Sequence, residues 1–95
     1  MPNRIITKRI GAILLERGIV YFRQSEFEKA VEDLTKTLAA DEKNASACRT
    51  RGESFLKLKR FSEALKDLQR AVELDPTLEP ALKPLIEEAK KESGY

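Results

Sequence analysis

The stretch RGESFLKLKRFSEALKDLQRAVELD, residues 51–75, decides the fold, and RGIVYFRQSEFEKAVEDLTKTLAAD, residues 17–41, repeats it. The two stretches align at an offset of 34 residues with seven identical positions. The identities are Arg17, Gly18, Phe27, Ala30, Asp33, Leu34 and Asp41, each matched by the same residue one period later. A fixed period of this length is typical of proteins built from stacked helical units.

Each unit is predicted to contain two helices joined by a short polar turn. The second helix of the first unit has apolar residues at the spacing of one buried stripe, namely Phe27, Ala30, Val31, Leu34 and Leu38. Ser25 with Glu28 three residues later predicts a capping box at the start of this helix. Asn44 is a natural N-cap for the helix that begins at Ala45.

Two repeated features indicate contacts between the two helices of a unit. Gly18 and Gly52 lie inside first helices, where glycine costs about 0.5–1 kcal/mol relative to alanine. We therefore expect a close approach of the second helix there, at Ala30 and Ala64. Arginine also recurs opposite aspartate, which predicts ion pairs of Arg17 with Asp33 and of Arg51 with Asp67.

At these residues the chain resembles the tetratricopeptide repeat family. The second unit matches the family's pattern at Gly52, Phe55, Ala64, Leu68, Ala71 and Pro76. The first matches at Gly18, Tyr21, Ala30 and Leu34 but departs from the usual Ala and Pro at Thr37 and Glu42. The resemblance implies an all-α fold of about five helices, in antiparallel hairpins stacked as a short right-handed superhelix. We expect one domain over residues 1–95, with repeats at 11–44 and 45–78 and a closing helix at 78–93.

The closing helix is expected to bury an apolar stripe against the second hairpin. The residues of that stripe are Leu82, Leu85, Ile86 and Ala89. Pro84 is uncomfortable inside a helix. Either the helix kinks at this proline or its regular part begins there.

The first helix, from about Asn3 to Arg23, is unusual because its apolar residues form two stripes. The broad stripe is Ile6, Ile10, Ile13, Leu14, Val20 and Tyr21, and we expect it to face the second helix and the second hairpin. Leu15, Ile19 and Phe22 form the other stripe. That stripe packs under a neighbouring segment of the same fold or under further repeats, lines a peptide groove, or mediates self-association.

The resemblance implies a binding scaffold whose first helices line a concave groove for peptides or proteins. The partner-binding residues it implies are Leu15, Ile19, Phe22, Arg23, Arg49, Glu53, Leu56, Lys57 and Lys83. This set combines apolar and basic side chains, so it favours a protein or peptide partner with apolar anchors and acidic residues. The alternative is a homodimer module that uses the long first helix.

One subclass of the family holds the acidic C-terminal tails of chaperones with a clamp of Lys, Asn and Arg side chains. The matching positions here are Leu15, Ile19, Thr50, Pro80 and Pro84, and none has such a side chain. We therefore expect no chaperone-tail binding in the clamp mode.

Composition excludes several other classes of protein. The chain has no histidine, no glycine-rich phosphate loop and no arrangement of a catalytic triad, so we expect no enzyme, metal site or cofactor. Cys48 is single, which predicts a small buried residue rather than a disulfide. The net charge of +2 with interleaved acids argues against nucleic acid as a partner. No apolar run suggests a membrane span or signal peptide, so a cytoplasmic location is expected.

Overall fold

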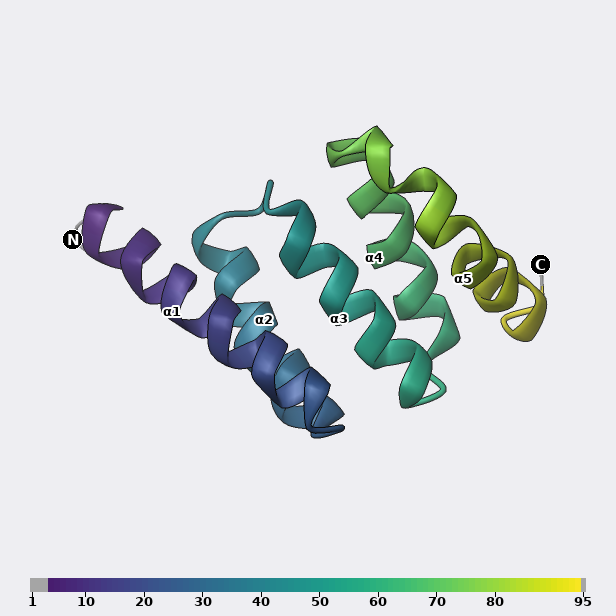
Figure 1. Cartoon of the computed structure of the whole chain (residues 1–95), viewed down its shortest axis with the longest axis horizontal. Helices are drawn as coiled ribbons and strands as arrows, with labels where there is room; N and C mark the ends of the chain where they lie inside the picture. Colours follow the sequence, from purple (N-terminus) through teal and green to yellow (C-terminus); the bar gives the residue numbers. More distant parts are fainter. Residues whose placement is uncertain (1–3, 95) are drawn as a thin grey trace.

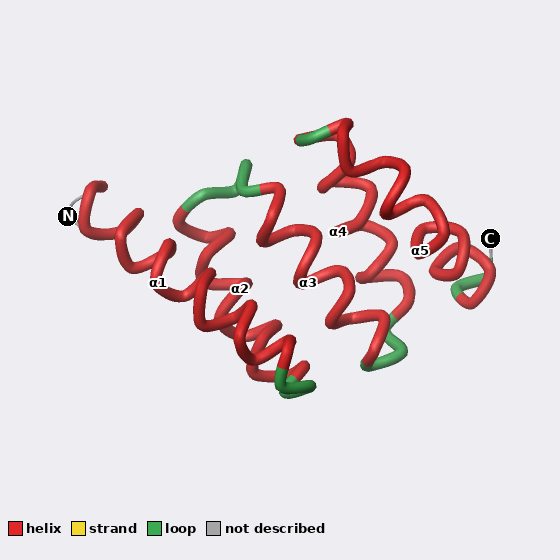
Figure 2. Tube along the Cα trace, in the orientation of Figure 1, coloured by secondary structure: helices red, strands yellow, loops and turns green. Residues whose placement is uncertain are grey.

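The computed structural model describes residues 4–94 of the chain and contains five α-helices, with no strand among those residues (Figures 1 and 2). The helices are α1 (Arg4–Arg23), α2 (Phe27–Ala40), α3 (Ala45–Lys57), α4 (Phe61–Leu74) and α5 (Glu79–Glu92), with a short 3-10 helix, η1 (Pro76–Leu78), before α5. The expected all-α fold of about five helices is confirmed. Asn3, where the first helix was expected to begin, lies outside the described residues.

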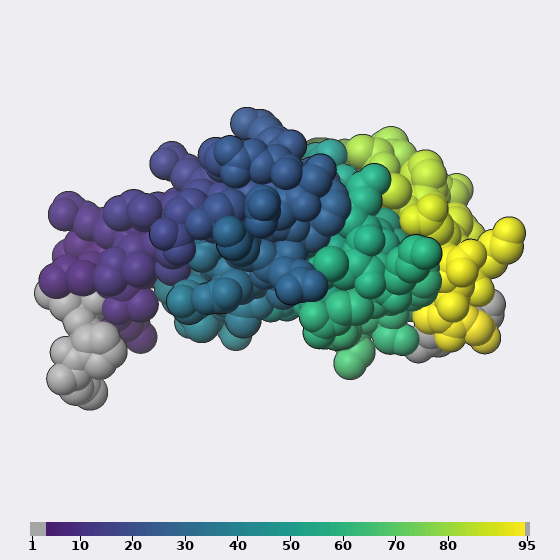
Figure 3. Space-filling model, turned by 90° about the horizontal axis from the view of Figure 1, so that it is seen from below, coloured from purple at the N-terminus to yellow at the C-terminus, as the bar shows by residue number. Residues whose placement is uncertain are grey.

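The helices are stacked in the order of the sequence. α1 packs against α2, α3 against both α2 and α4, and α5 against α4 (Figure 1). α1 also contacts α3, so the first helices of the two hairpins are neighbours. The molecule is elongated, 42 × 26 × 21 Å, and the first turns of α1 form one end of it (Figure 3). Within residues 4–94, no helix is both long enough and apolar enough to cross a membrane.

Two apolar clusters hold the stack together. The larger is centred on α3, α4 and α5, and its fully buried members are Ala64, Leu68, Ala71, Leu82 and Ala89. The smaller joins the hairpins through Ala30, Leu34 and Ala47. Cys48 is 3% exposed within the larger cluster, as the sequence predicted for a small buried residue.

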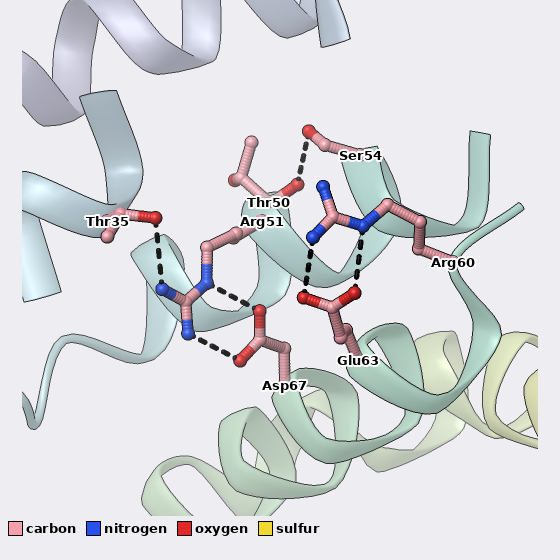
Figure 4. A network of polar contacts seen from close by, with 7 residues as sticks. All are labelled: Thr35, Thr50, Arg51, Ser54, Arg60, Glu63 and Asp67. Carbon is pink, nitrogen blue, oxygen red and sulfur yellow. Dashed lines mark hydrogen bonds and ion pairs between the residues drawn. The ribbon is translucent and has the colours of Figure 1, made fainter. Parts of the chain in front are cut away.

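The repeated arginines form the predicted ion pairs between first and second helices. Arg17 Nε and Nη2 donate to the two carboxylate oxygens of Asp33 at 2.6 and 2.9 Å. Arg51 repeats this arrangement with Asp67 at 2.6 and 2.8 Å, and its Nη1 also donates to Thr35 Oγ1 of α2 at 3.2 Å (Figure 4). The hydrogen bonds that Arg51 donates to Asp67 raise the pKa of its guanidinium, which therefore stays charged.

The glycines of α1 and α3 allow a close approach, but not at the residues we expected. A Cβ at Gly18 would lie 2.8 Å from Leu34 Cγ, and one at Gly52 would lie 2.9 Å from Leu68 Cγ. The expected approach at Ala30 and Ala64 is therefore wrong, because the branched leucine side chains fill the space beside each glycine.

The two hairpin turns share a backbone conformation that the capping-box prediction missed. Ser25 and Lys59 occupy the same position of each unit, and both have φ of 61°. α2 begins at Phe27 with Glu26 as its N-cap, and no side chain caps it, so the prediction for Ser25 is wrong. The left-handed turn places Ser25 outside the helix end. The prediction for Asn44 is confirmed, since its side chain accepts a bond of 2.9 Å from the Ala47 N–H.

The orientation of α1 differs from the expected one. Gly11 and Gly18 are buried on the face toward α2, and Leu14 and Tyr21 on its flank are half-buried. The remaining four residues of the broad stripe are exposed, so its expected burial is wrong for Ile6, Ile10, Ile13 and Val20. The cause is that close packing of α2 requires glycine, which turns the isoleucines outward.

The closing helix has the predicted buried stripe. Leu82 and Ala89 are fully buried, and Leu85 and Ile86 are half-buried against the same cluster. α5 begins at Glu79 and continues through Pro84. The regular part of the helix therefore begins before this proline, contrary to one of the two alternatives above.

Candidate partner-binding groove

A groove of about 770 Å³ lies between α3 and α5, near the turn that joins α3 to α4. Its lining residues come from four helices and that turn: Phe22, Glu53, Leu56, Lys57, Lys59, Phe61, Leu85, Glu88 and Glu92. The groove exists because α5 packs on α4 rather than directly on α3. A single extended segment or one helix is the size of object that such a groove receives.

The groove has an apolar floor supplied by Phe22, Leu56, Phe61 and Leu85. Phe22 and Phe27 meet edge to face with ring centroids 5.6 Å apart. This contact helps to fix the orientation of the Phe22 ring, which α1 contributes to the groove. Phe61 and Leu85 pack against the larger cluster, so the floor continues the core of the protein. The apolar surface is therefore fixed in position before any partner binds.

Charges of opposite sign lie on the two sides of this floor. Lys57 and Lys59 lie on the α3 side, while Glu88 and Glu92 lie on α5. Glu53, on α3, is half-buried, and burial raises the pKa of its carboxyl group. Nearby Arg49 and Lys57 act in the opposite direction on that pKa. The α3 side of the groove is therefore cationic at Lys57 and Lys59 but also contains Glu53, which pairs with Arg49, and the α5 side is anionic.

The structure brings together four of the nine residues predicted from the sequence. Phe22, Glu53, Leu56 and Lys57 all line the groove. Arg23 is exposed in the last turn of α1, next to Phe22 in the sequence. Arg49 lies one turn before Glu53, and its Nε is 3.7 Å from the Glu53 carboxylate. This ion pair balances the charge of Arg49, which was expected to contribute positive charge to the groove.

Leu15 and Ile19 lie outside the groove, although they share the second stripe of α1 with Phe22. Both are half-buried, and Leu15 packs with Phe22 against the cluster that joins the hairpins. For Leu15, packing under a neighbouring segment is therefore the alternative that the structure supports. Neither Leu15 nor Ile19 lines the groove between α3 and α5.

Lys83 lies in a different hollow from the predicted residues that line the groove. It lies with Glu87 beside Gln69, Val72 and Ile86, in a shallow hollow between α4 and α5. The buried positions Leu82 and Ala89 set the rotation of α5 about its axis, and that rotation turns Lys83 away from α3.

Sequence reasoning missed five groove residues: Lys59, Phe61, Leu85, Glu88 and Glu92. The resemblance implied Lys83 as the residue that the closing helix contributes to the groove. The signal that could have corrected this was the stripe of α5 itself. Because Leu82, Leu85 and Ala89 lie on one side of the helix, Glu88 and Glu92 follow Leu85 toward the groove.

The stack of hairpins and its open groove define a helical-repeat scaffold as the class of protein. The sequence pattern of the family described as tetratricopeptide repeat matches residues 15–79. This match covers more than half of the chain, and the chain therefore belongs to the tetratricopeptide repeat family.

Curated relatives share the repeat but are much longer proteins. The chain is 37% identical over 62 residues to Tetratricopeptide repeat protein 37 of Xenopus laevis, and 34% identical over 62 residues to Hsp70-Hsp90 organizing protein 1 of Glycine max. These matches cover 65% of this chain but only 4% and 11% of the relatives. RNA polymerase II-associated protein 3 of Mus musculus is 34% identical over 65 residues, which is 68% of this chain and 10% of that protein.

Solved structures of similar folds contain chaperone peptides. The second tetratricopeptide domain of human RPAP3, in complex with the HSP70 peptide SGPTIEEVD, has a TM-score of 0.78 and 27% identity. The match covers 97% of this chain and 73% of that one. The second such domain of Spaghetti (RPAP3), bound to the HSP90 peptide SRMEEVD, has a TM-score of 0.71 and 28% identity, and the match covers 90% of this chain and 87% of that one.

Proposed function

We propose that this chain is a non-catalytic binding module that holds a peptide segment of a partner protein in the groove between α3 and α5. The observation that carries the proposal is the fixed apolar floor of Phe22, Leu56, Phe61 and Leu85. Aromatic and aliphatic pockets of this kind receive the anchor residues of a partner. The peptide complexes of similar domains support a peptide as the ligand.

The charges favour a partner segment with a defined direction. Acidic residues of the segment would lie toward Lys57 and Lys59, and basic or neutral residues toward Glu88 and Glu92. Arg23 would extend the cationic side at the end of α1. A uniformly acidic segment would meet repulsion from α5. The preferred ligand is therefore an apolar anchor with acidic residues on one side only.

A clamp on a C-terminal carboxylate has less support than this mode. Neither Thr50 nor Leu15 has a cationic side chain that could hold a carboxylate. Thr50 is also only 8% exposed, and Leu15 is half-buried. Pro80 and Pro84 are exposed but have no donor in their side chains. We expect a peptide ending in EEVD to bind no more tightly than the same peptide with an amidated end.

Self-association through Leu15, Ile19 and Phe22 is also less well supported. Leu15 and Phe22 already pack against the cluster between the hairpins, so little of this stripe remains for a second copy.

Amide chemical shifts during titration with synthetic peptides test the proposal. The peptides carry an apolar anchor flanked on one side by acidic, basic or neutral residues. The acidic peptide should shift the amides of Leu56, Lys57 and Leu85, and Lys57→Glu should weaken its binding about tenfold. Lys66→Glu, an equal charge reversal at an exposed position of α4, is the control and should not change it. Shifts confined to other surfaces would overturn the proposal.

A further inference from the structure

The outer face of α1 carries a stripe of exposed apolar residues at the end of the stack. Ile13 is 63% exposed and Val20 46%, whereas Ile10 lies on the flank toward α2, beside Lys36 and Ala39. α1 lies first in the row of helices, with α2 and α3 on its inner side (Figure 1). We call Ile13 and Val20 the outer stripe. Because Ile13 and Val20 are seven residues apart, they lie on the same side of the helix.

The repeat shows that the equivalent face of α3 docks a helix. The residues one period after Ile13 and Val20 are Ala47 and Ser54, and each is 0% exposed. Ala47 belongs to the cluster that includes Ala30 and Leu34 of α2. In α3, therefore, this face is covered by the preceding helix of the chain. In α1 the same face is bare.

The side chains of α1 do not fit a helix that docks as α2 does on α3. In α3 the interface positions are small, Ala47, Thr50 and Ser54, all buried. The matching positions of α1 are Ile13, Glu16 and Val20, so an α2-like approach would clash with two large side chains and bury a carboxylate. The occupant of the outer stripe must lie farther away and must offer a cation near Glu16.

We propose that this occupant is α1 of a second copy of the chain, paired antiparallel about Ile13. An antiparallel pair centred there places Arg9 of each copy beside Glu16 of the other. Both residues are exposed, lie on the same flank of the outer stripe, and enter no ion pair within residues 4–94. The opposite flank carries Arg17, whose charge is already balanced by Asp33. Antiparallel alignment also opposes the two helix dipoles favourably.

This surface is separate from the groove between α3 and α5. None of its residues lines that groove, so the two proposals can succeed or fail independently. A dimer formed in this way would leave both grooves open.

Sedimentation velocity over a wide range of concentration, on the full chain, tests the proposal. The chain should pass from monomer to dimer as its concentration rises. Ile13→Glu should weaken the dimer at least about tenfold, because it places two carboxylates face to face on the symmetry axis. Ser62→Glu, at an exposed position of α4, is the matched control and should leave the dimer unchanged. Helical circular dichroism verifies that each variant is folded.

Charge reversal tests the antiparallel arrangement itself. Arg9→Glu and Glu16→Arg should each weaken the dimer, and the two together in one chain should restore it. A monomer at all concentrations would overturn the proposal and indicate that another protein's helix, or a preceding repeat, covers the outer stripe. A dimer that Ile13→Glu leaves intact would overturn it as well.

Discussion

Arg51 of α3 and Asp67 of α4 are joined by two parallel hydrogen bonds of 2.6 and 2.8 Å, with only 23% and 10% of their side chains exposed. The same arginine reaches Thr35 of α2, so one side chain links three consecutive helices (Figure 4). Arg60 and Glu63 form a pair of the same geometry, 2.8 Å for both bonds, with half of each side chain exposed. The protein therefore contains two bidentate pairs of the same geometry, one largely buried and one half-exposed, whose contributions to stability can be compared.

The buried pair should stabilise the fold more than the exposed pair. We expect Asp67→Ala to lower the free energy of unfolding by about 2 kcal/mol, because it leaves the Arg51 guanidinium without its main acceptor. Glu63→Ala should change the free energy by less than about 0.5 kcal/mol, since water replaces the lost acceptor. Urea denaturation followed by circular dichroism measures both values, and equal losses would contradict the comparison.

The contact between α3 and α4 at Gly52 should not tolerate a methyl group. The added Cβ of Gly52→Ala would lie 2.9 Å from Leu68 Cγ and 3.1 Å from Asp67 Cβ, and Leu68 is fully buried. We expect a loss of about 1–3 kcal/mol despite the better helix propensity of alanine. Thermal unfolding checks the sign. In the double variant with Leu68→Ala, the total loss should be smaller than the sum of the two single losses, because the smaller side chain makes room for the methyl group.

The loop before α2 and the loop before α3 differ in helix capping, although a side-chain cap was predicted for both. Asn44→Ala should destabilise the protein by about 1 kcal/mol, because the Ala47 N–H loses its acceptor. Ser25→Ala should have almost no effect, since the Ser25 side chain caps no helix. Ser25→Gly should be neutral or stabilising because φ of 61° suits glycine. A large loss of stability in Ser25→Ala would contradict this expectation and indicate that Ser25 does cap α2.

The thiol of Cys48 should report on opening of the hairpin interface. Cys48 is 3% exposed, and burial raises its pKa, so the reactive thiolate is scarce in the folded protein even at mildly alkaline pH. We expect an aromatic disulfide reagent to react far more slowly with the native chain than with the unfolded one. Gly52→Ala should accelerate the reaction. Rapid reaction of the native protein would show that this part of the core opens readily.

Glu53 should make the fold less stable as the pH rises. Its pKa is raised by burial, so its contribution to stability is fully present below the unfolded pKa and is lost as the pH rises through the folded pKa. Glu53→Gln should therefore gain stability relative to the natural chain as the pH increases from acidic to neutral. Glu42→Gln, at an exposed position, is the control and should show no such trend. The measurement is urea denaturation at several pH values.

The sequence predicted the helices and the buried faces of α2, α4 and α5, but not the face that α1 presents. The stripes of α2, α4 and α5 are one-sided, so their periodicity alone identifies the buried positions. α1 has apolar residues around most of its circumference, and periodicity cannot choose among them. Gly11 and Gly18 mark its inner face, because only they permit the approach of Ala40 and Leu34.

The groove was harder to predict because it depends on where the repeat ends. The resemblance to the family implied groove residues on α1 and α3, and four of them, Phe22, Glu53, Leu56 and Lys57, line the groove. The burial of Leu82 and Ala89, rather than the repeat, sets the orientation of α5 about its axis. That orientation determines which α5 residues form the other side of the groove. Departures such as Pro84 marked α5 as irregular but did not indicate the angle of its rotation.

The order of contacts along the stack has a kinetic consequence. Nearly every helix touches mainly its neighbours in the chain, so few contacts join distant parts of the sequence. Folding can therefore start in either hairpin and spread from one unit to the next, rather than waiting for the two ends of the chain to meet. Hydrogen exchange should accordingly be fastest in the terminal helices and slowest in α3 and α4, whose protected amides would exchange only when the whole stack opens.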